Sequence, residues 1–135
     1  MSFMEPNEKI AIAGWEEVKM MVDTFYDKVR KDDLLGPIFD ERIHDWGPHL
    51  DKMYRFWNAV LFQKPGYFGA PFAPHATMPI GALHFERWVQ LFRANLEERF
   101  TGGVAEEASW RAGKMADLFR SKKEYLDNSH MQNLF

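Results

Sequence analysis

The sequence predicts an all-α fold of four main helices, with one long uncharged loop between the second and the third. Along four segments the apolar residues recur at three- and four-residue steps, which is the spacing of one helix face, and no segment alternates convincingly as a strand. Residues 65 to 85 contain no Asp, Glu, Lys or Arg, although 27% of the chain is charged and about six such residues are expected there. Two helix pairs crossing around a pocket walled by this loop is the architecture that we expect.

The first helix is predicted to begin at Trp15 and to stop at Asp32-Asp33 and Gly36-Pro37. Its apolar stripe consists of Trp15, Val18, Val22, Phe25 and Val29. Tyr26 lies on the edge of this stripe, one helical turn after Val22. Ile38-Phe39 are expected to begin a short connecting turn.

The second helix is predicted from Asp45, which is a suitable N-cap. Pro48 does not oppose this prediction, because proline is tolerated in the first turn of a helix. Its stripe consists of Trp46, His49, Leu50, Met53, Phe56, Trp57, Val60 and Leu61. Lys64-Pro65-Gly66 is expected to end it.

After the loop, Pro79 can start a third helix, and a fourth is expected near Thr101-Gly102-Gly103. The stripe of the third consists of Leu83, Trp88, Leu91, Phe92 and Leu96. The fourth is expected to bury Val104, Ala108, Met115, Leu118 and Phe119. Its periodic signal fades at Lys122-Lys123 into a polar tail.

Length and composition indicate a single domain over residues 1–135, with an N-terminal extension at 1–14 and a polar C-terminal tail at 127–135. The lack of cysteine excludes disulfides, thiolate nucleophiles and Cys-ligated metal sites. A net charge of −3 with dispersed Lys and Arg argues against nucleic acid as a partner. No secretory signal is visible, and four prolines make the only long uncharged run a poor membrane span, so we expect a cytoplasmic protein.

The uncharged loop is the most informative segment for function. Its prolines remove backbone donors, so its first fifteen residues are neither a helix nor a central strand. Its apolar side chains need something to pack against: Tyr67, Phe68, Phe72, Met78 and Ile80. A loop of this kind with His75 near its middle is typical of one wall of a ligand site. A lone histidine in a proline-rich loop is nevertheless more often a surface residue than a ligand.

The usual enzyme and metal signatures are missing from the chain. It has no Gly-x-Ser-x-Gly, no phosphate-binding loop, no Gly-x-Gly-x-x-Gly and no His-Glu-x-x-His. What remains is His75 facing helices that carry Tyr26, His49 and Trp88 on or beside their apolar stripes. Haem needs one strong axial ligand, apolar and aromatic walls and a few polar distal groups, and this set of residues suits it. The 21 aromatic residues fit a flat cofactor, although an aromatic core would equally explain them.

Five motifs make the sequence resemble the truncated haemoglobins, or two-over-two globins, of the third bacterial group. The matches cover roughly residues 15 to 120 and are Phe25-Tyr26-x-x-Val29, Leu35-Gly36-Pro37-Ile38-Phe39, Trp46-x-x-His49 with Phe56-Trp57, Tyr67-x-Gly69-x-Pro71-x-x-x-His75, and His84-Phe85-x-x-Trp88 with Arg111-Ala112. The combination is specific, although no single motif would be.

The resemblance implies a two-over-two helical sandwich around haem b, with His75 as the proximal iron ligand and with Tyr26, His49 and Trp88 on the distal side. The residues that it places at the cofactor are Phe39, His49, Met53, Phe56, His75 and Trp88. Met53 departs from the family pattern, where a branched aliphatic is commoner, and adds flexibility there.

The function that follows is reversible binding of oxygen and other diatomic ligands, including carbon monoxide and nitric oxide, with an unidentified reductase as electron donor. A distal tyrosine that donates to bound oxygen slows its release, which argues against bulk transport. A haem enzyme with peroxidase-like or nitric oxide dioxygenase activity needs the same residues and stays an alternative. A helical module without a cofactor would be colourless when purified.

Overall fold

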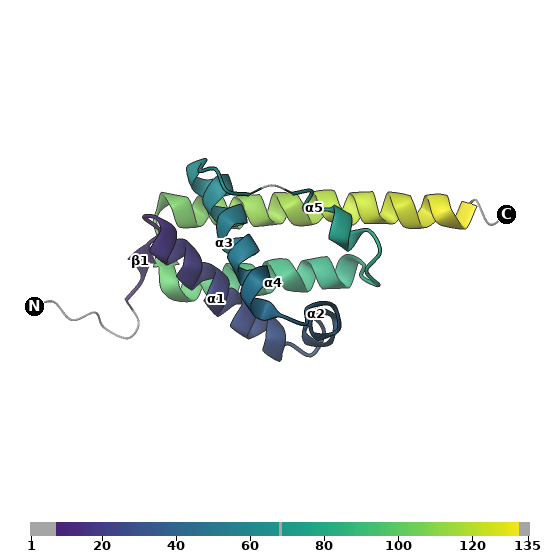
Figure 1. The fold of residues 1–135 in the computed structure, drawn as a ribbon, viewed down its shortest axis with the longest axis horizontal. Coiled ribbons are helices and arrows are strands. Elements are labelled where there is room, and N and C mark those ends of the chain that lie inside the picture. The colour runs from purple at the N-terminus through teal and green to yellow at the C-terminus, as the bar shows by residue number, and fades with distance from the viewer. Residues whose placement is uncertain (1–7, 68, 133–135) are drawn as a thin grey trace, which may run out of the picture.

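The structure, a computed structural model, describes residues 8–67 and 69–132. Its elements are β1 (Ile10–Ala11), α1 (Trp15–Lys31), α2 (Gly36–Arg42), α3 (Trp46–Phe62), the 3-10 turn η1 (Ala73–His75), α4 (Ala82–Arg99), β2 (Phe100–Thr101) and α5 (Gly103–Gln132). Helices α1 and α3 pack on each other, α4 and α5 run side by side, and α1 also packs on α4 (Figure 1). The predicted all-α two-over-two architecture is confirmed.

Helix α1 forms the centre of the hydrophobic core. The predicted stripe residues Val18, Val22, Phe25 and Val29 are all at most 2% exposed, and Trp15 at the helix start is 37% exposed. Burial of such a stripe supplies most of the stability of a helix in water. Helix α1 begins at the predicted residue, Trp15.

The connection from α1 to α2 is held by Asp32. Its Oδ2 accepts the backbone N–H groups of Leu34 and Leu35 at 3.1 and 3.0 Å. A Cβ at Gly36 would lie 2.8 Å from the carbonyl oxygen of Arg30, so only glycine allows this close approach. The segment that was expected to be a short turn is the seven-residue helix α2, which presents Phe39 to the core.

Helix α3 has the ends that were predicted. The Asp45 side chain accepts the backbone N–H of Gly47 at 3.2 Å, as an N-cap does. The helix ends at Phe62, and its C-cap residue Gln63 adopts the left-handed conformation with φ of 57°.

Helix α4 begins at Ala82, three residues later than predicted. The backbone N–H of Gly81 donates to Nδ1 of His84 at 3.0 Å, and this contact closes the helix start. Leu83 was expected in the core but is 70% exposed, and Phe85 is buried in its place. Leu83 lies nine residues before the buried Phe92, half a turn out of phase with it, whereas Phe85 lies seven residues before Phe92 and shares its face.

Helix α5 differs from the prediction at its C-terminal end. It continues to Gln132, so described residues of the expected polar tail are helical, and its end extends past the other helices (Figure 1). Leu118, expected to be buried, is 51% exposed. Residues 1–7 of the predicted extension and 133–135 of the predicted tail lie outside the described residues.

The short parallel pair between β1 and β2, in which Ile10 lies opposite Phe100, was not predicted. Two residues are too few to show alternation. The pair ties the chain before α1 to the connection between α4 and α5. Within the described part of the chain, no helix has the length and apolar character needed to cross a membrane.

Candidate functional site

The aromatic ring of Tyr26 lies at the centre of a cluster built from three helices. Ring centroids of Phe39 on α2, and of Trp46 and His49 on α3, lie 5.9, 5.7 and 5.2 Å from it, all in edge-to-face geometry. Trp46 and His49 also contact each other at 5.6 Å. The structure therefore brings together three predicted site residues, Tyr26, Phe39 and His49.

The hydroxyl of Tyr26 is kept protonated by its surroundings. The side chain is 7% exposed, and burial raises the pKa of Tyr26 above its ordinary value. A phenol that stays neutral can donate a hydrogen bond without bringing charge into an apolar region.

His49 carries a buried nitrogen that no protein group satisfies. Its Nε2 has no hydrogen-bond partner among the described residues. The pKa of His49 is lowered by burial, and further by the charges of Lys52 and His75. The ring is therefore neutral near pH 7 and has a nitrogen available to a group outside the protein.

His75 is held by the loop that carries it. Its Nδ1 lies 2.7 Å from the carbonyl oxygen of Pro71. Because a carbonyl can only accept, Nδ1 carries the proton, and Nε2 keeps a free lone pair. Burial lowers the pKa of His75, against the opposite effect of the Pro71 hydrogen bond, so the neutral ligand form is favoured.

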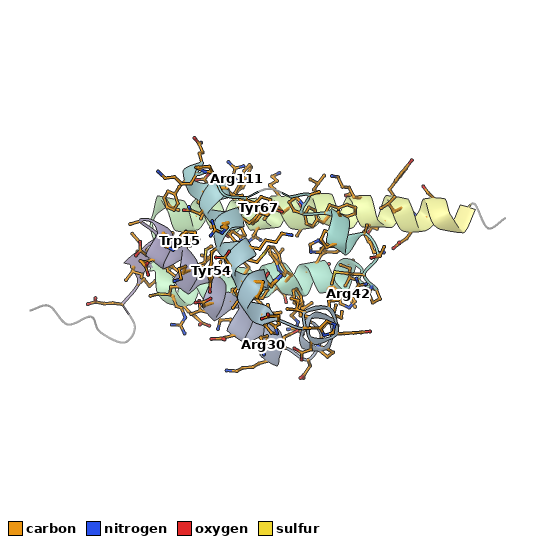
Figure 2. The ribbon with its side chains drawn as sticks, in the orientation of Figure 1. Trp15, Arg30, Arg42, Tyr54, Tyr67 and Arg111 are labelled. Carbon is orange, nitrogen blue, oxygen red and sulfur yellow. The ribbon has the colours of Figure 1, made fainter. Side chains whose placement is uncertain are left out.

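The ring of His75 is positioned by aromatic packing on α5. Its centroid lies 5.0 Å from that of Phe119, which in turn contacts Phe72 at 5.4 Å. Arg42 of α2 donates to the carbonyl oxygen of Thr77 at 3.0 Å and points toward the segment between η1 and α4 (Figure 2). The loop is thus fixed on both sides of the histidine.

The remaining predicted residues lie around these two groups. Trp88 has no ring contact with Tyr26 among those observed; the ring of Phe25 lies between them, at 5.6 Å from Trp88 and 5.0 Å from Tyr26. Met53 and Phe56 are partly buried against the core. Phe56 contacts Tyr67 of the uncharged loop at 5.2 Å, so the loop does pack on α3 as expected.

Sequence reasoning assigned no role at the site to three residues that contact its members: Trp46 and Pro71, which lie within the matching motifs, and Phe119. Trp46 stacks under the guanidinium of Arg30, 4.5 Å from the ring centroid, and contacts both Tyr26 and His49. Trp46 and Phe119 do lie on the predicted stripes, but a stripe does not distinguish a site residue from a core residue. For the role of the Pro71 carbonyl the sequence carries no signal.

The comparisons with known proteins agree on one family. A sequence model of the family described as bacterial-like globin matches residues 10–121. The group 3 truncated hemoglobin ctb of Campylobacter jejuni is 32% identical over 118 residues, which are 84% of this chain and 93% of that protein. This chain belongs to the group III truncated haemoglobins. The crystal structure of the group III truncated hemoglobin from Campylobacter jejuni resembles it with a TM-score of 0.78 at 30% identity, covering 85% of this chain and 94% of that one.

Haem, with its iron, is therefore the cofactor of this truncated haemoglobin. The donor set fits haem: His75 has a free Nε2, and His49 has a buried Nε2 without a protein partner. Half-buried Phe39, Met53 and Phe56 supply apolar surface suited to a macrocycle.

Proposed function

We propose that this truncated haemoglobin binds oxygen and other diatomic gases reversibly, at haem iron held by His75 and with Tyr26, His49 and Trp88 on the opposite side. The observation that carries the proposal is the hydrogen bond from Nδ1 of His75 to the carbonyl oxygen of Pro71, at 2.7 Å. This bond selects the tautomer whose Nε2 can bind a metal and holds the ring in one orientation. His84, in contrast, uses its Nδ1 as an acceptor in the start of α4.

The cofactor supplies an open iron site that binds a diatomic ligand; the residues of the chain set how tightly that ligand is held. Tyr26 offers a buried, neutral O–H donor, and its ring is fixed by three neighbours. A hydrogen bond to a partly charged ligand is stronger than a neutral one, particularly where water is excluded. The expected result is slow oxygen release, which suits retention or sensing of oxygen better than delivery.

His49 supplies the second distal contact and borders the solvent. It is the fourth residue of α3, next to exposed Pro48, and it is half-buried. A neutral imidazole with an unsatisfied nitrogen can bond a ligand, or can rotate outward and open a route to solvent. We therefore assign His49 to control of entry, and Tyr26 to control of release.

Replacement of His75 by glycine tests the proposal. The wild-type protein is expected to bind haem and to take up and release oxygen, while His75→Gly loses the haem or needs added imidazole to restore the ferrous absorption spectrum. His44→Gly is the control, because His44 is an exposed histidine between α2 and α3. An unaltered ferrous spectrum of His75→Gly without imidazole would refute the assignment of the iron ligand.

A further inference from the structure

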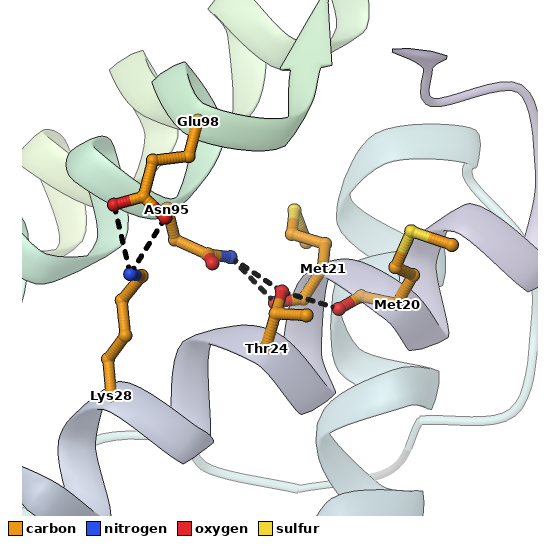
Figure 3. A network of polar contacts seen from close by, with 6 residues as sticks. All are labelled: Met20, Met21, Thr24, Lys28, Asn95 and Glu98. Atoms are coloured by element: carbon orange, nitrogen blue, oxygen red, sulfur yellow. Dashed lines mark hydrogen bonds and ion pairs between the residues drawn. The ribbon is translucent and has the colours of Figure 1, made fainter. Parts of the chain in front are cut away.

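The interface between α1 and α4 contains one fully buried amide. Asn95 of α4 is 0% exposed. Its Nδ2 donates to the carbonyl oxygen of Met21 at 3.1 Å and to the hydroxyl of Thr24 at 3.0 Å, both on α1 (Figure 3). The Thr24 hydroxyl donates in turn to the carbonyl oxygen of Met20 at 2.7 Å. The amide is thus bonded to α1 in the turn that precedes Tyr26.

Packing alone does not explain an amide at this position. The Oδ1 of Asn95 is buried and has no hydrogen-bond partner among the described residues. An unsatisfied buried acceptor costs stability, and an apolar side chain of the same size would avoid this cost. Unlike an apolar side chain, the amide is directional, because its two hydrogen bonds form in only one alignment of the helices.

The same face of α4 carries the aromatic residues that contact Phe25, the neighbour of Tyr26 in the chain. Trp88, Phe92 and Asn95 follow one another at four and three residues, which places them on one helix face. Phe25 contacts both Trp88 and Phe92, at 5.6 and 5.1 Å, and touches Tyr26 at 5.0 Å. A shift of α1 along α4 would therefore change the separation of Tyr26 and Trp88.

We propose that Asn95 is a positioning residue: its bonds to Met21 and Thr24 set the register of α1 against α4, and thereby the placement of Tyr26 relative to Trp88. Apolar helix faces tolerate small shifts, and buried polar residues are known to fix one register of packed helices. The inference rests on the proposed distal roles of Tyr26 and Trp88, because only these roles make the register visible in ligand binding.

A second tie between the same helices supplies a matched control. Nζ of Lys28 on α1 lies 2.8 Å from a carboxylate oxygen of Glu98 on α4 (Figure 3). The two side chains are 28% and 52% exposed, and exposed ion pairs between long side chains constrain their helices little. Glu98→Gln therefore removes the exposed α1–α4 ion pair and leaves the buried, directional contact of Asn95 in place.

The experiment compares Asn95→Leu, Thr24→Val and Glu98→Gln in the haem-loaded protein. The readouts are the C–O stretching band of the carbon monoxide form and the stopped-flow rate of oxygen release. We expect Asn95→Leu and Thr24→Val to shift or split the C–O band and to raise the rate of oxygen release about three- to tenfold. This increase is smaller than the one expected when the hydrogen bond from Tyr26 to the ligand is lost entirely. Glu98→Gln, and Thr24→Ser, which keeps the hydroxyl, are expected to match the wild type.

Two results separate a failure of this inference from a failure of the proposed function. If Tyr26→Phe changes the band and the release rate while Thr24→Val and any folded Asn95→Leu protein do not, Asn95 serves stability alone and the positioning role is refuted. If Tyr26→Phe itself changes neither, the proposed distal role of Tyr26 fails first. Should Asn95→Leu not fold, Thr24→Val decides, because it replaces one β-branched side chain with another of the same shape.

Discussion

Replacing Tyr26 with phenylalanine removes a single oxygen atom from the proposed distal side. The ring contacts with Phe39, Trp46 and His49, at 5.9, 5.7 and 5.2 Å, do not involve the hydroxyl, so the cluster is expected to keep its packing. Since burial raises the pKa of Tyr26, the wild-type hydroxyl is protonated throughout the neutral range and acts only as a neutral donor. The substitution therefore isolates one hydrogen bond to the ligand.

The size of the effect follows from the strength of that bond. A hydrogen bond to a charged or partly charged group contributes about 1.5–3 kcal/mol, and every 1.4 kcal/mol is a factor of about ten. Stopped-flow measurement of oxygen release should therefore show a rate about ten- to a hundredfold higher in Tyr26→Phe than in the wild type. Carbon monoxide, which is less polar when bound, should be affected far less.

Trp88 provides the test of this reasoning. Phe25 contacts both Trp88 and Tyr26, so the two residues share a packing neighbour and the effects of the two substitutions need not add. The same measurement on Trp88→Phe and on the double variant determines how the two residues share the role. If Tyr26→Phe releases oxygen at the wild-type rate and Trp88→Phe releases it faster, Trp88 holds the ligand and our ranking is wrong.

Two further substitutions test the entry route and the fold. His49→Leu should change the association rate of carbon monoxide in flash photolysis more than it changes haem retention, and unaltered association would make His49 a residue of the site edge only. Because the pKa of His49 in the folded protein lies below its unfolded value, wild-type stability should fall as the pH drops below about 6.5, and urea unfolding should show a smaller loss in His49→Leu. Gly36→Ala should lower the free energy of unfolding by about 1–3 kcal/mol, because its Cβ would meet the Arg30 carbonyl, whereas Gly47→Ala, at an ordinary 3.5 Å contact, should be near neutral; equal effects would refute the close-approach argument.

Helix positions could be predicted where the local signals agreed. Trp15 and Asp45 mark helix starts in both sequence and structure, because the apolar period begins at Trp15 and the side chain of Asp45 caps α3. The start of α4 was misplaced. Proline is permitted as a first helical residue, which favoured Pro79, but the helix begins where the backbone N–H of Gly81 donates to the side chain of His84. A cap made by a histidine nitrogen is uncommon and has no reliable signal in a single sequence.

For the site, the sequence indicates candidate residues, whose roles stay predictions, but only part of their geometry. His75 stood out because charge is missing around it, and Tyr26 and His49 because they lie on or beside apolar stripes. Which carbonyl orients the His75 ring depends on the path of an irregular loop, and the sequence does not specify it. The aromatic neighbours Trp46 and Phe119 were hidden for another reason: periodicity reports burial, and a residue beside a cofactor has the same period as one in the core.

A crystal structure of the haem-loaded protein with cyanide bound tests the central claim most directly. The account predicts that the iron is bonded to Nε2 of His75, that Nδ1 of the same ring remains on the Pro71 carbonyl, and that the outer atom of the ligand lies within hydrogen-bond distance of the Tyr26 hydroxyl. Iron bonded to His49 or His84 instead, or a ligand on the side away from Tyr26, would contradict it.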